Sequence, residues 1–213
     1  MRFETLLDRP AGARALLVLG HGAGAGMRHA FLEAAAAAFA REGVATLRYP
    51  FPYMEKGSRR PDPQPVLLER VRSGGAAARE AAPDLPLLVG GKSMGGRMTS
   101  LAQARGAIGG VRGLVFLGFP LHPAGKPGVE RAAHLARVEA PMLFLQGTRD
   151  KLAGLELLRP VLADLPRATL HVVEGAVHGF AVLKRSGRTA EDVLGEIARV
   201  TAAWAAAAPP PPR

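Results

Sequence analysis

Three residues of the types that cooperate in nucleophilic catalysis follow three separate apolar runs of the chain. Ser93 is the centre of the G-x-S-x-G pattern at residues 91–95, Asp150 follows the run PMLFLQG, and His178 follows the run TLHVVEG. A serine hydroxyl is a weak nucleophile until a histidine accepts its proton, and a carboxylate orients that histidine. The order serine, aspartate, histidine is one known chain order for such a triad. The sequence therefore predicts that Ser93 attacks an acyl group, with His178 as its base and Asp150 as the orienting acid.

The glycines around Ser93 favour a sharp turn from a strand into a helix. Gly91 and Gly95 stand two residues before and after the serine, where side chains would collide across such a turn. The same letters would end a phosphate-binding loop of pattern G-x-x-x-x-G-K-[ST], but that pattern needs a glycine where the chain has Pro86. We therefore prefer the nucleophilic serine, and a glycine-rich turn with an idle serine remains the alternative.

Attack on an acyl group places negative charge on the carbonyl oxygen, and backbone amides must stabilise that charge. The residue after the nucleophile commonly provides one amide, here Met94, and a loop after an earlier strand provides the second. The segment HGAGAG at residues 21–26 follows an apolar run and consists mainly of small residues. We expect Ala23 or Gly22 to donate the second hydrogen bond of this oxyanion hole.

Further polar and aromatic residues adjoin the predicted site. His21 opens the glycine-rich loop, Lys92 precedes the serine, Tyr49 ends an apolar run, and His122 lies in a proline-rich loop. We expect these four residues at the border of the pocket. Lys92 would lower the pKa of a neighbouring acid or favour an anionic acyl group, although its simplest role is to face solvent or pair with a carboxylate. Arg97 is expected to pair with an acid and stabilise the turn.

Apolar runs of strand length alternate with longer segments of helical character. Strands are predicted at residues 15–19, 44–49, 85–90, 113–117, 141–146 and 169–173, with a weaker edge strand at 3–7. Helices are predicted at residues 28–42, 65–81, 96–104, 128–136, 154–165 and 189–206, and loops at 50–65 and 120–128. Continuous apolar runs are typical of strands buried on both faces, and repeated βα units predict a mostly parallel sheet with helices on both faces.

These elements predict a single-domain α/β fold over residues 1–208, with a central sheet of about six or seven strands. The predicted nucleophile, acid and base each follow the carboxyl end of a strand, the edge of an open parallel sheet where ligands bind. No large insertion separates the strands at 113–117 and 141–146, so we expect no large lid and a shallow, open pocket. Residues 209–213 are expected to form a disordered, proline-rich tail.

The chain is basic, with 28 lysines and arginines against 18 acidic residues and a formal net charge of +10. The arginines are spread along the sequence, and aromatic residues make up only 5% of it, too few for a base-stacking surface. We interpret the excess charge as a solvated basic surface and expect no nucleic-acid partner.

Composition sets the broad class of the protein. The 213 residues are 48% hydrophobic, enough to bury one sizeable core. They contain no run of about 18 apolar residues that would cross a membrane. The first residues lack the layout of a secretory signal, and the chain has no cysteine, which fits a cytoplasmic protein. We expect a small-molecule acyl substrate, with no cofactor, no metal and no membrane partner; the sequence does not predict an oligomeric state.

The glycine-rich loop also supports a rival hypothesis. Residues 20–25 match the G-x-G-x-x-G/A fingerprint of dinucleotide-binding proteins and follow a predicted strand. That fingerprint requires an acidic residue about 20 positions further on, at the end of the next strand. The chain has Arg48 and Tyr49 there instead, although an arginine would suit a phosphorylated dinucleotide. A dinucleotide site would leave the predicted triad unexplained, so it remains the less favoured alternative.

With these motifs in place, the chain resembles the α/β-hydrolase superfamily, most of all its small lid-less branch near the dienelactone-hydrolase-like proteins. It is similar to predicted bacterial hydrolases that carry HGAGAG, GKSMGGR, a PLHP-x-GKP loop and a late HGF. These motifs stand here at residues 21–26, 91–97, 120–127 and 178–180. The resemblance covers roughly residues 16–204.

The resemblance implies an α/β-hydrolase fold and a Ser-His-Asp hydrolase, or esterase, acting on esters or related acyl bonds. Dienelactone hydrolases proper use a cysteine nucleophile, which this chain lacks, so their substrate is not implied. The eukaryotic relatives include a subunit of a chromatin-modifying complex. A non-catalytic interaction module on the same fold is therefore the second function hypothesis.

Overall fold

A seven-stranded sheet forms the centre of the computed structural model, which describes residues 3–207 of the chain. Its strand order is β1-β3-β2-β4-β5-β6-β7, and all neighbouring strands are parallel except β1 and β3. The strands are β1 Leu6–Asp8, β2 Ala15–Gly20, β3 Val44–Tyr49, β4 Leu87–Lys92, β5 Val111–Leu117, β6 Met142–Gly147 and β7 Ala168–Val173. This confirms the predicted mostly parallel sheet.

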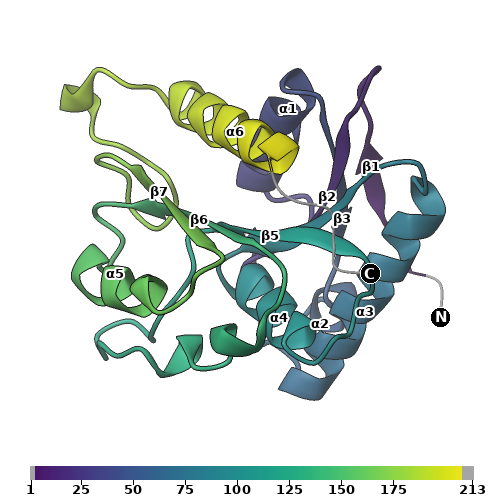
Figure 1. The fold of residues 1–213 in the computed structure, drawn as a ribbon, viewed down its shortest axis with the longest axis horizontal. Coiled ribbons are helices and arrows are strands. Elements are labelled where there is room, and N and C mark those ends of the chain that lie inside the picture. The colour runs from purple at the N-terminus through teal and green to yellow at the C-terminus, as the bar shows by residue number, and fades with distance from the viewer. Residues whose placement is uncertain (1–2, 208–213) are drawn as a thin grey trace.

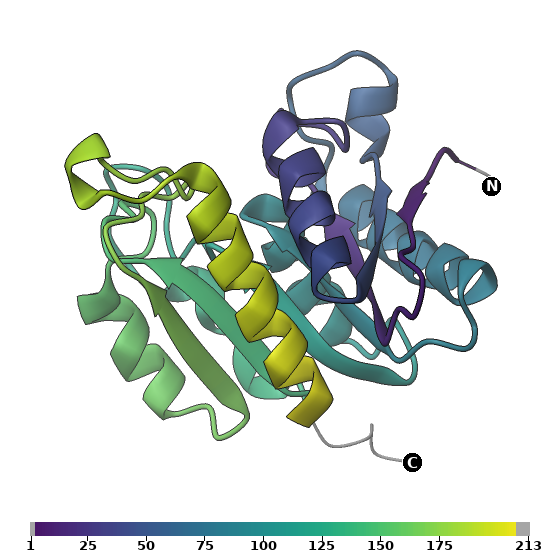
Figure 2. The same ribbon diagram turned by 90° about the horizontal axis from the view of Figure 1, so that it is seen from above.

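Helices cover both faces of this sheet, as predicted. The α-helices are α1 Ala30–Arg41, α2 Pro52–Glu55, α3 Gln64–Ala81, α4 Met94–Gln103, α5 Leu155–Ala163 and α6 Ala190–Ala207. Helices α1 and α6 lie side by side on one face, and α3, α4 and α5 lie on the other (Figures 1 and 2). No helix within residues 3–207 is both long enough and apolar enough to span a bilayer.

Two hydrophobic cores explain why the strand sequences are continuously apolar. Along β2, Leu16 and Val18 pack on the side of α3 and α4, whereas Leu17 and Leu19 pack on the side of α1 and α6. Successive side chains of a strand point to opposite faces, so a strand buried on both faces needs an apolar residue at every position. Burial of each leucine contributes roughly 1.5–3 kcal/mol, which holds the central strands rigidly under the site.

A reciprocal capping pair stands at the start of the last helix. The backbone amide of Thr189 donates to the Asp192 carboxylate at 2.8 Å, and the amide of Asp192 donates to the Thr189 hydroxyl at 3.1 Å. The hydrogen bonds that the Asp192 carboxylate accepts from the Thr189 amide and hydroxyl lower the pKa of Asp192 below its usual value. Two amides that the first turn of α6 would leave without partners are thereby satisfied.

Two local predictions are wrong. The predicted helix at 128–136 consists of two short 3₁₀ turns, η1 Glu130–Ala132 and η2 Leu135–Arg137. A helix of so few residues gains little over its costly nucleus, and here the chain bends to bury Ala132 and Leu135 instead. The predicted loop at 50–65 contains α2, which begins at Pro52, a residue suited to the first helical position.

The connection from β5 to β6 holds only η1 and η2, so no large lid is apparent over the carboxyl edge of the sheet. A third 3₁₀ turn, η3 Lys184–Ser186, lies between β7 and α6. The predicted proline-rich tail at 209–213 lies outside the described residues.

Candidate active site

Ser93 stands at the turn between the central strand β4 and helix α4. Its backbone has φ 51° and ψ −115°, and residues other than glycine rarely adopt a positive φ. Holding a non-glycine residue there costs of the order of 1–3 kcal/mol, which the surrounding packing must offset. The turn lifts the serine above the carboxyl edge of the sheet, as expected of a strained nucleophile turn.

The glycines of the motif are needed because the backbone of β2 passes directly beside the turn. A Cβ atom on Gly91 would lie 2.3 Å from the carbonyl oxygen of Gly20, and one on Gly95 would lie 2.2 Å from the same oxygen. Gly91 also has φ 153°. The turn and the glycine-rich loop that begins at Gly20 therefore contact each other through main-chain atoms, a contact that the sequence does not reveal.

The three predicted triad residues meet in space. The Nε2 atom of His178 lies 2.8 Å from the Ser93 hydroxyl, and its Nδ1 atom lies 2.7 Å from Oδ2 of Asp150. When Nδ1–H donates to the carboxylate, Nε2 is left as the acceptor for the serine proton. The Asp150 side chain is fully buried and that of His178 is 25% exposed. The arrangement has the geometry of a nucleophile, a base and an orienting acid.

Asp150 is itself held by two further hydrogen bonds. Gln146 donates from Nε2 to Oδ2 at 2.6 Å, and the amide of Leu152 donates to Oδ1 at 2.8 Å. Gln146 in turn accepts a hydrogen bond from the amide of Phe119 at 3.1 Å. The sequence interpretation missed Gln146, yet a signal existed: it is the one polar side chain in the apolar run of β6, and it is fully buried.

Lys92 contradicts its simplest expectation, since its amino group is buried and forms no ion pair within residues 3–207. Within the part of the chain that the structure describes, its buried Nζ atom has no hydrogen-bond partner. It lies 5.6 Å from the ring centre of Phe180 and 6.0 Å from that of Phe31. Burial lowers the pKa of Lys92 to about 8, and the nearby Asp150 carboxylate only partly opposes this.

We expect Lys92→Met to stabilise the protein at pH 7, because burying the ammonium costs about 3 kcal/mol for a pKa lowered from 10.5 to about 8. Below pH 8 lysine is charged in both states and the folded state bears the whole cost. As pH rises from about 8 to 10.5, the unfolded chain retains a proton that the folded chain has released, so wild-type stability rises and the gain from methionine disappears.

Urea denaturation of both proteins at pH 7 and pH 10.5 measures this difference. Lys184→Met, at an exposed position in η3, is the control. A stability gain from Lys92→Met that is equal at the two pH values would contradict the buried-ammonium explanation.

The predicted oxyanion residues lie beside Ser93. Met94 and Ala23 line one cavity together with the serine, and among residues 3–207 their backbone amides donate no hydrogen bond. Gly22 is equally close, since a Cβ on it would lie 3.9 Å from the Cβ of Ser93. The amide of Gly24, in contrast, already donates to the Tyr53 hydroxyl at 3.1 Å. Within the described residues, the amides of Met94 and Ala23 are therefore free to donate to a ligand in this cavity.

Two residues expected at the pocket border are buried beneath it instead. His21 accepts a hydrogen bond at Nε2 from the amide of Phe51 at 3.0 Å, and its Nδ1 donates to the Gly22 carbonyl at 2.8 Å. Burial lowers the pKa of His21, so the neutral ring holds the shape of the glycine-rich loop. Tyr49 is also buried, with its hydroxyl packed against Gly20, and burial raises its pKa. Both side chains support the loop and do not line the cavity.

The cavity beside the serine has a volume of about 510 Å³. It is lined by Ala23, Pro61, Asp62, Gln64, Leu67, Ser93, Met94, Arg97, Met98, Pro120, His122, Pro123, Ala124, Arg131 and Leu152. His122 thus lies where the sequence predicted it, with Nδ1 donating to the carbonyl of Pro123 at 2.8 Å. The expected ion pair of Arg97 is not formed: among the described residues, Arg97 pairs with no acid.

A second serine–histidine contact exists away from this cavity. The Oγ atom of Ser100 lies 2.7 Å from Nε2 of His134, and it donates to the carbonyl of Arg97 at 2.9 Å. Both residues are buried, and no carboxylate of the described chain bonds to His134. Burial and two neighbouring arginines lower the pKa of His134 to about 4. This pair braces helix α4 against η2 and has no acid to orient its imidazole.

The dinucleotide hypothesis loses its remaining support. Arg48, the candidate for a dinucleotide phosphate, is 6% exposed and donates to the Asp8 carboxylate at 2.8 Å and to the Met27 carbonyl at 3.1 Å. Helix α1 begins only at Ala30, so its amino end does not adjoin the glycines at 20 and 22. A phosphate-binding turn needs that helix end directly after the glycines.

Comparisons with known proteins agree with this architecture. The chain is similar to an alpha-beta serine hydrolase homologue from Coxiella burnetii, at 20% identity and a TM-score of 0.74, over 92% of this chain and 90% of that chain. A dienelactone hydrolase from Anabaena variabilis is similar at 21% identity and a TM-score of 0.73, over 94% and 89%. A serine hydrolase without a lid from Xanthomonas campestris is similar at 20% identity and a TM-score of 0.70, over 98% and 90%.

At about 20% identity, these likenesses show that the chain shares the fold of the three proteins, among them a dienelactone hydrolase and a serine hydrolase without a lid. A family model described as the alpha/beta hydrolase domain matches residues 13–206, nearly the whole chain. Together with the sheet topology, this match shows that the chain belongs to the alpha/beta hydrolase domain family.

Proposed function

We propose that the protein is a serine hydrolase of the esterase type, which cleaves small acyl esters or related acyl bonds through an acyl-enzyme intermediate. The observation that carries this proposal is the hydrogen-bonded chain from Ser93 through His178 to Asp150. It lies at the edge of the sheet where α/β proteins bind ligands, and it opens onto the cavity of about 510 Å³.

In the proposed first half-reaction, the Ser93 hydroxyl attacks the carbonyl carbon of the substrate while its proton passes to Nε2 of His178. The charge that develops on the carbonyl oxygen accepts hydrogen bonds from the amide of Met94 and from that of Ala23 or Gly22. One such donor is worth about 10²- to 10³-fold in turnover. When the tetrahedral species collapses, the imidazolium gives its proton to the leaving alcohol, and the acyl group stays on Ser93.

In the second half-reaction, a water molecule gives its proton to His178 and attacks the acyl-serine. The same amides stabilise the new oxyanion, and the bond to Ser93 breaks as the serine recovers its proton and the acid leaves. Asp150 stays charged throughout and holds the imidazole in one orientation. Because no large lid covers the cavity, small acyl substrates fit the proposal better than long lipids do.

A fluorophosphonate probe tests the proposal directly. We expect the wild-type protein to be labelled on the peptide that carries Ser93 and the Ser93→Ala variant to remain unlabelled, because only an activated serine attacks phosphorus. Ser100→Ala is the matched control, since it removes the buried serine of the other serine–histidine pair and should keep the label. Labelling that survives in Ser93→Ala, or an unlabelled wild type that also hydrolyses no p-nitrophenyl ester, would overturn the proposal.

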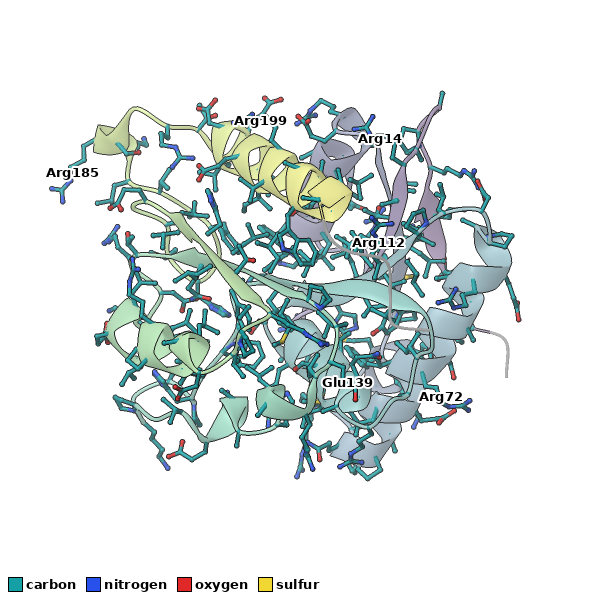
Figure 3. All side chains as sticks on the ribbon, in the orientation of Figure 1. Arg14, Arg72, Arg112, Glu139, Arg185 and Arg199 are labelled. Carbon is teal, nitrogen blue, oxygen red and sulfur yellow. The ribbon has the colours of Figure 1, made fainter. Side chains whose placement is uncertain are left out.

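An interaction module that has lost turnover predicts the opposite result and a partner whose binding weakens with salt. Among the arginines that Figure 3 labels, the exposed Arg72, Arg185 and Arg199 lie on separate parts of the molecule. The complete hydrogen-bonded chain at Ser93 favours the hydrolase.

A further inference from the structure

Two arginines without acidic partners line the cavity that contains Ser93. Arg97 stands on α4, one turn after the serine, with its amide bonded to the Ser93 carbonyl at 3.0 Å. Arg131 stands in η1 on the β5–β6 connection. Within residues 3–207 neither forms an ion pair, whereas Arg48 and Arg70 each pair with a carboxylate. The cavity is therefore lined by two positively charged groups that form no ion pair with any residue the structure describes.

The environment of Arg97 is electrostatically unfavourable as it stands. Its Nε atom is buried and has no hydrogen-bond partner among the described residues. Burial lowers the pKa of Arg97, and the charge of Arg131 lowers it further, so the two guanidinium groups are close enough to repel each other. A buried donor without an acceptor and two neighbouring like charges both cost free energy. An anion placed between the two groups would relieve both.

The other charged and polar groups of the cavity do not supply that anion. Asp62 is the cavity's acid, but its charge acts on the pKa of Tyr53 and not on that of Arg97. His122 directs Nδ1–H to a backbone carbonyl. Gln64 is polar but uncharged, and apart from the serine the rest of the lining is apolar, including Met98 and Leu152. The cavity thus combines an apolar wall with one pair of unneutralised cations.

We propose that Arg97 and Arg131 bind a carboxylate or phosphate of the substrate, so that the preferred esters carry a second, negatively charged group a few atoms from the scissile bond. This inference rests on the proposed hydrolase function and names its substrate class. A guanidinium presents two parallel N–H groups to such an oxyanion, which gives orientation as well as affinity. Because Arg97 follows Ser93 by one helical turn, binding there places the ester carbonyl next to the hydroxyl.

The test compares mono-p-nitrophenyl glutarate, which carries a carboxylate, with its neutral methyl ester. We expect wild-type kcat/KM to favour the charged ester by about 10- to 100-fold, the effect of hydrogen bonds to a charged group. Arg131→Gln and Arg97→Gln should each reduce this ratio, mainly by raising KM for the charged ester. Arg72→Gln, an exposed arginine on α3 that pairs with Glu69, is the control and should leave the ratio unchanged.

Equal wild-type kcat/KM values for the two esters, or arginine variants that lower both values alike, would overturn the inference. Inhibition of the charged ester's hydrolysis by free glutarate and by inorganic phosphate shows whether the site prefers a carboxylate or a phosphate. If neither ester is hydrolysed, the proposed function fails, and the inference is then decided by calorimetric titration of glutarate and phosphate into Ser93→Ala. Binding that weakens in Arg131→Gln supports the anion site, and absence of binding refutes it.

Discussion

Replacing Ser93 and His178 together should lower kcat no further than replacing either one alone. Each of Ser93→Ala and His178→Ala is expected to reduce kcat for a p-nitrophenyl ester by about 10⁴-fold or more, and the double variant by the same factor. The reason is the single hydrogen bond of 2.8 Å through which the two side chains act as one unit. A hydroxyl without its base, or a base without its hydroxyl, leaves only the contribution of the oxyanion amides.

Steady-state kinetics of the four proteins, each checked for folding by circular dichroism, measures this effect. Replacing the other serine–histidine pair, as Ser100→Ala and His134→Ala, is the matched control, because both residues are buried away from the cavity. Losses that multiply in the Ser93 and His178 double variant would mean that the two residues act independently, and the proposed mechanism would be wrong.

Gly95→Ala should destabilise the protein and abolish most of its activity. The new methyl group would lie 2.2 Å from the Gly20 carbonyl oxygen and 2.8 Å from that of His21, so the backbone must move apart. Overpacking of this kind costs about 1–3 kcal/mol or more, a large part of the roughly 5–15 kcal/mol that stabilises a domain. The displaced segment is the oxyanion loop, and a shift of about 1 Å at a reacting group costs about 10²-fold in rate.

Denaturation curves and kcat of Gly95→Ala measure both effects. Gly109→Ala is the control, because a Cβ there meets no atom within 4 Å. If Gly95→Ala kept the stability and turnover of the wild-type protein, the close contact between β2 and the serine turn would not be needed for folding or activity.

The sequence predicted the sheet, the helices on both faces and the three residues that meet at its carboxyl edge. Those predictions succeed because each depends on a local pattern: a continuously apolar strand, a glycine on each side of Ser93, and a polar residue directly after a strand. A parallel sheet then brings strand ends together whatever the sequence between them.

The predictions that failed depend on residues distant in the sequence. Lys92 is enclosed by Phe31 from α1 and Phe180 from the turn after β7, and no local pattern indicates that these two rings converge. Arg97 and Arg131 line one cavity, with Arg131 in a 3₁₀ turn where the sequence predicted a helix. In both cases, tertiary packing decides which charged side chains are buried.

The Gly20 carbonyl lies against both Gly91 and Gly95. Because of this contact, the residues that set the geometry of attack differ from the residues that would select the substrate. The spacing between the serine turn and the oxyanion loop depends on this main-chain contact and on the buried side chains of His21 and Tyr49 beneath the loop, none of which lines the cavity. Under the anion-site proposal, selectivity belongs to Arg97 on α4 and Arg131 on the β5–β6 connection. A protein engineer can therefore exchange those groups to alter which molecules are accepted while the geometry of attack stays intact.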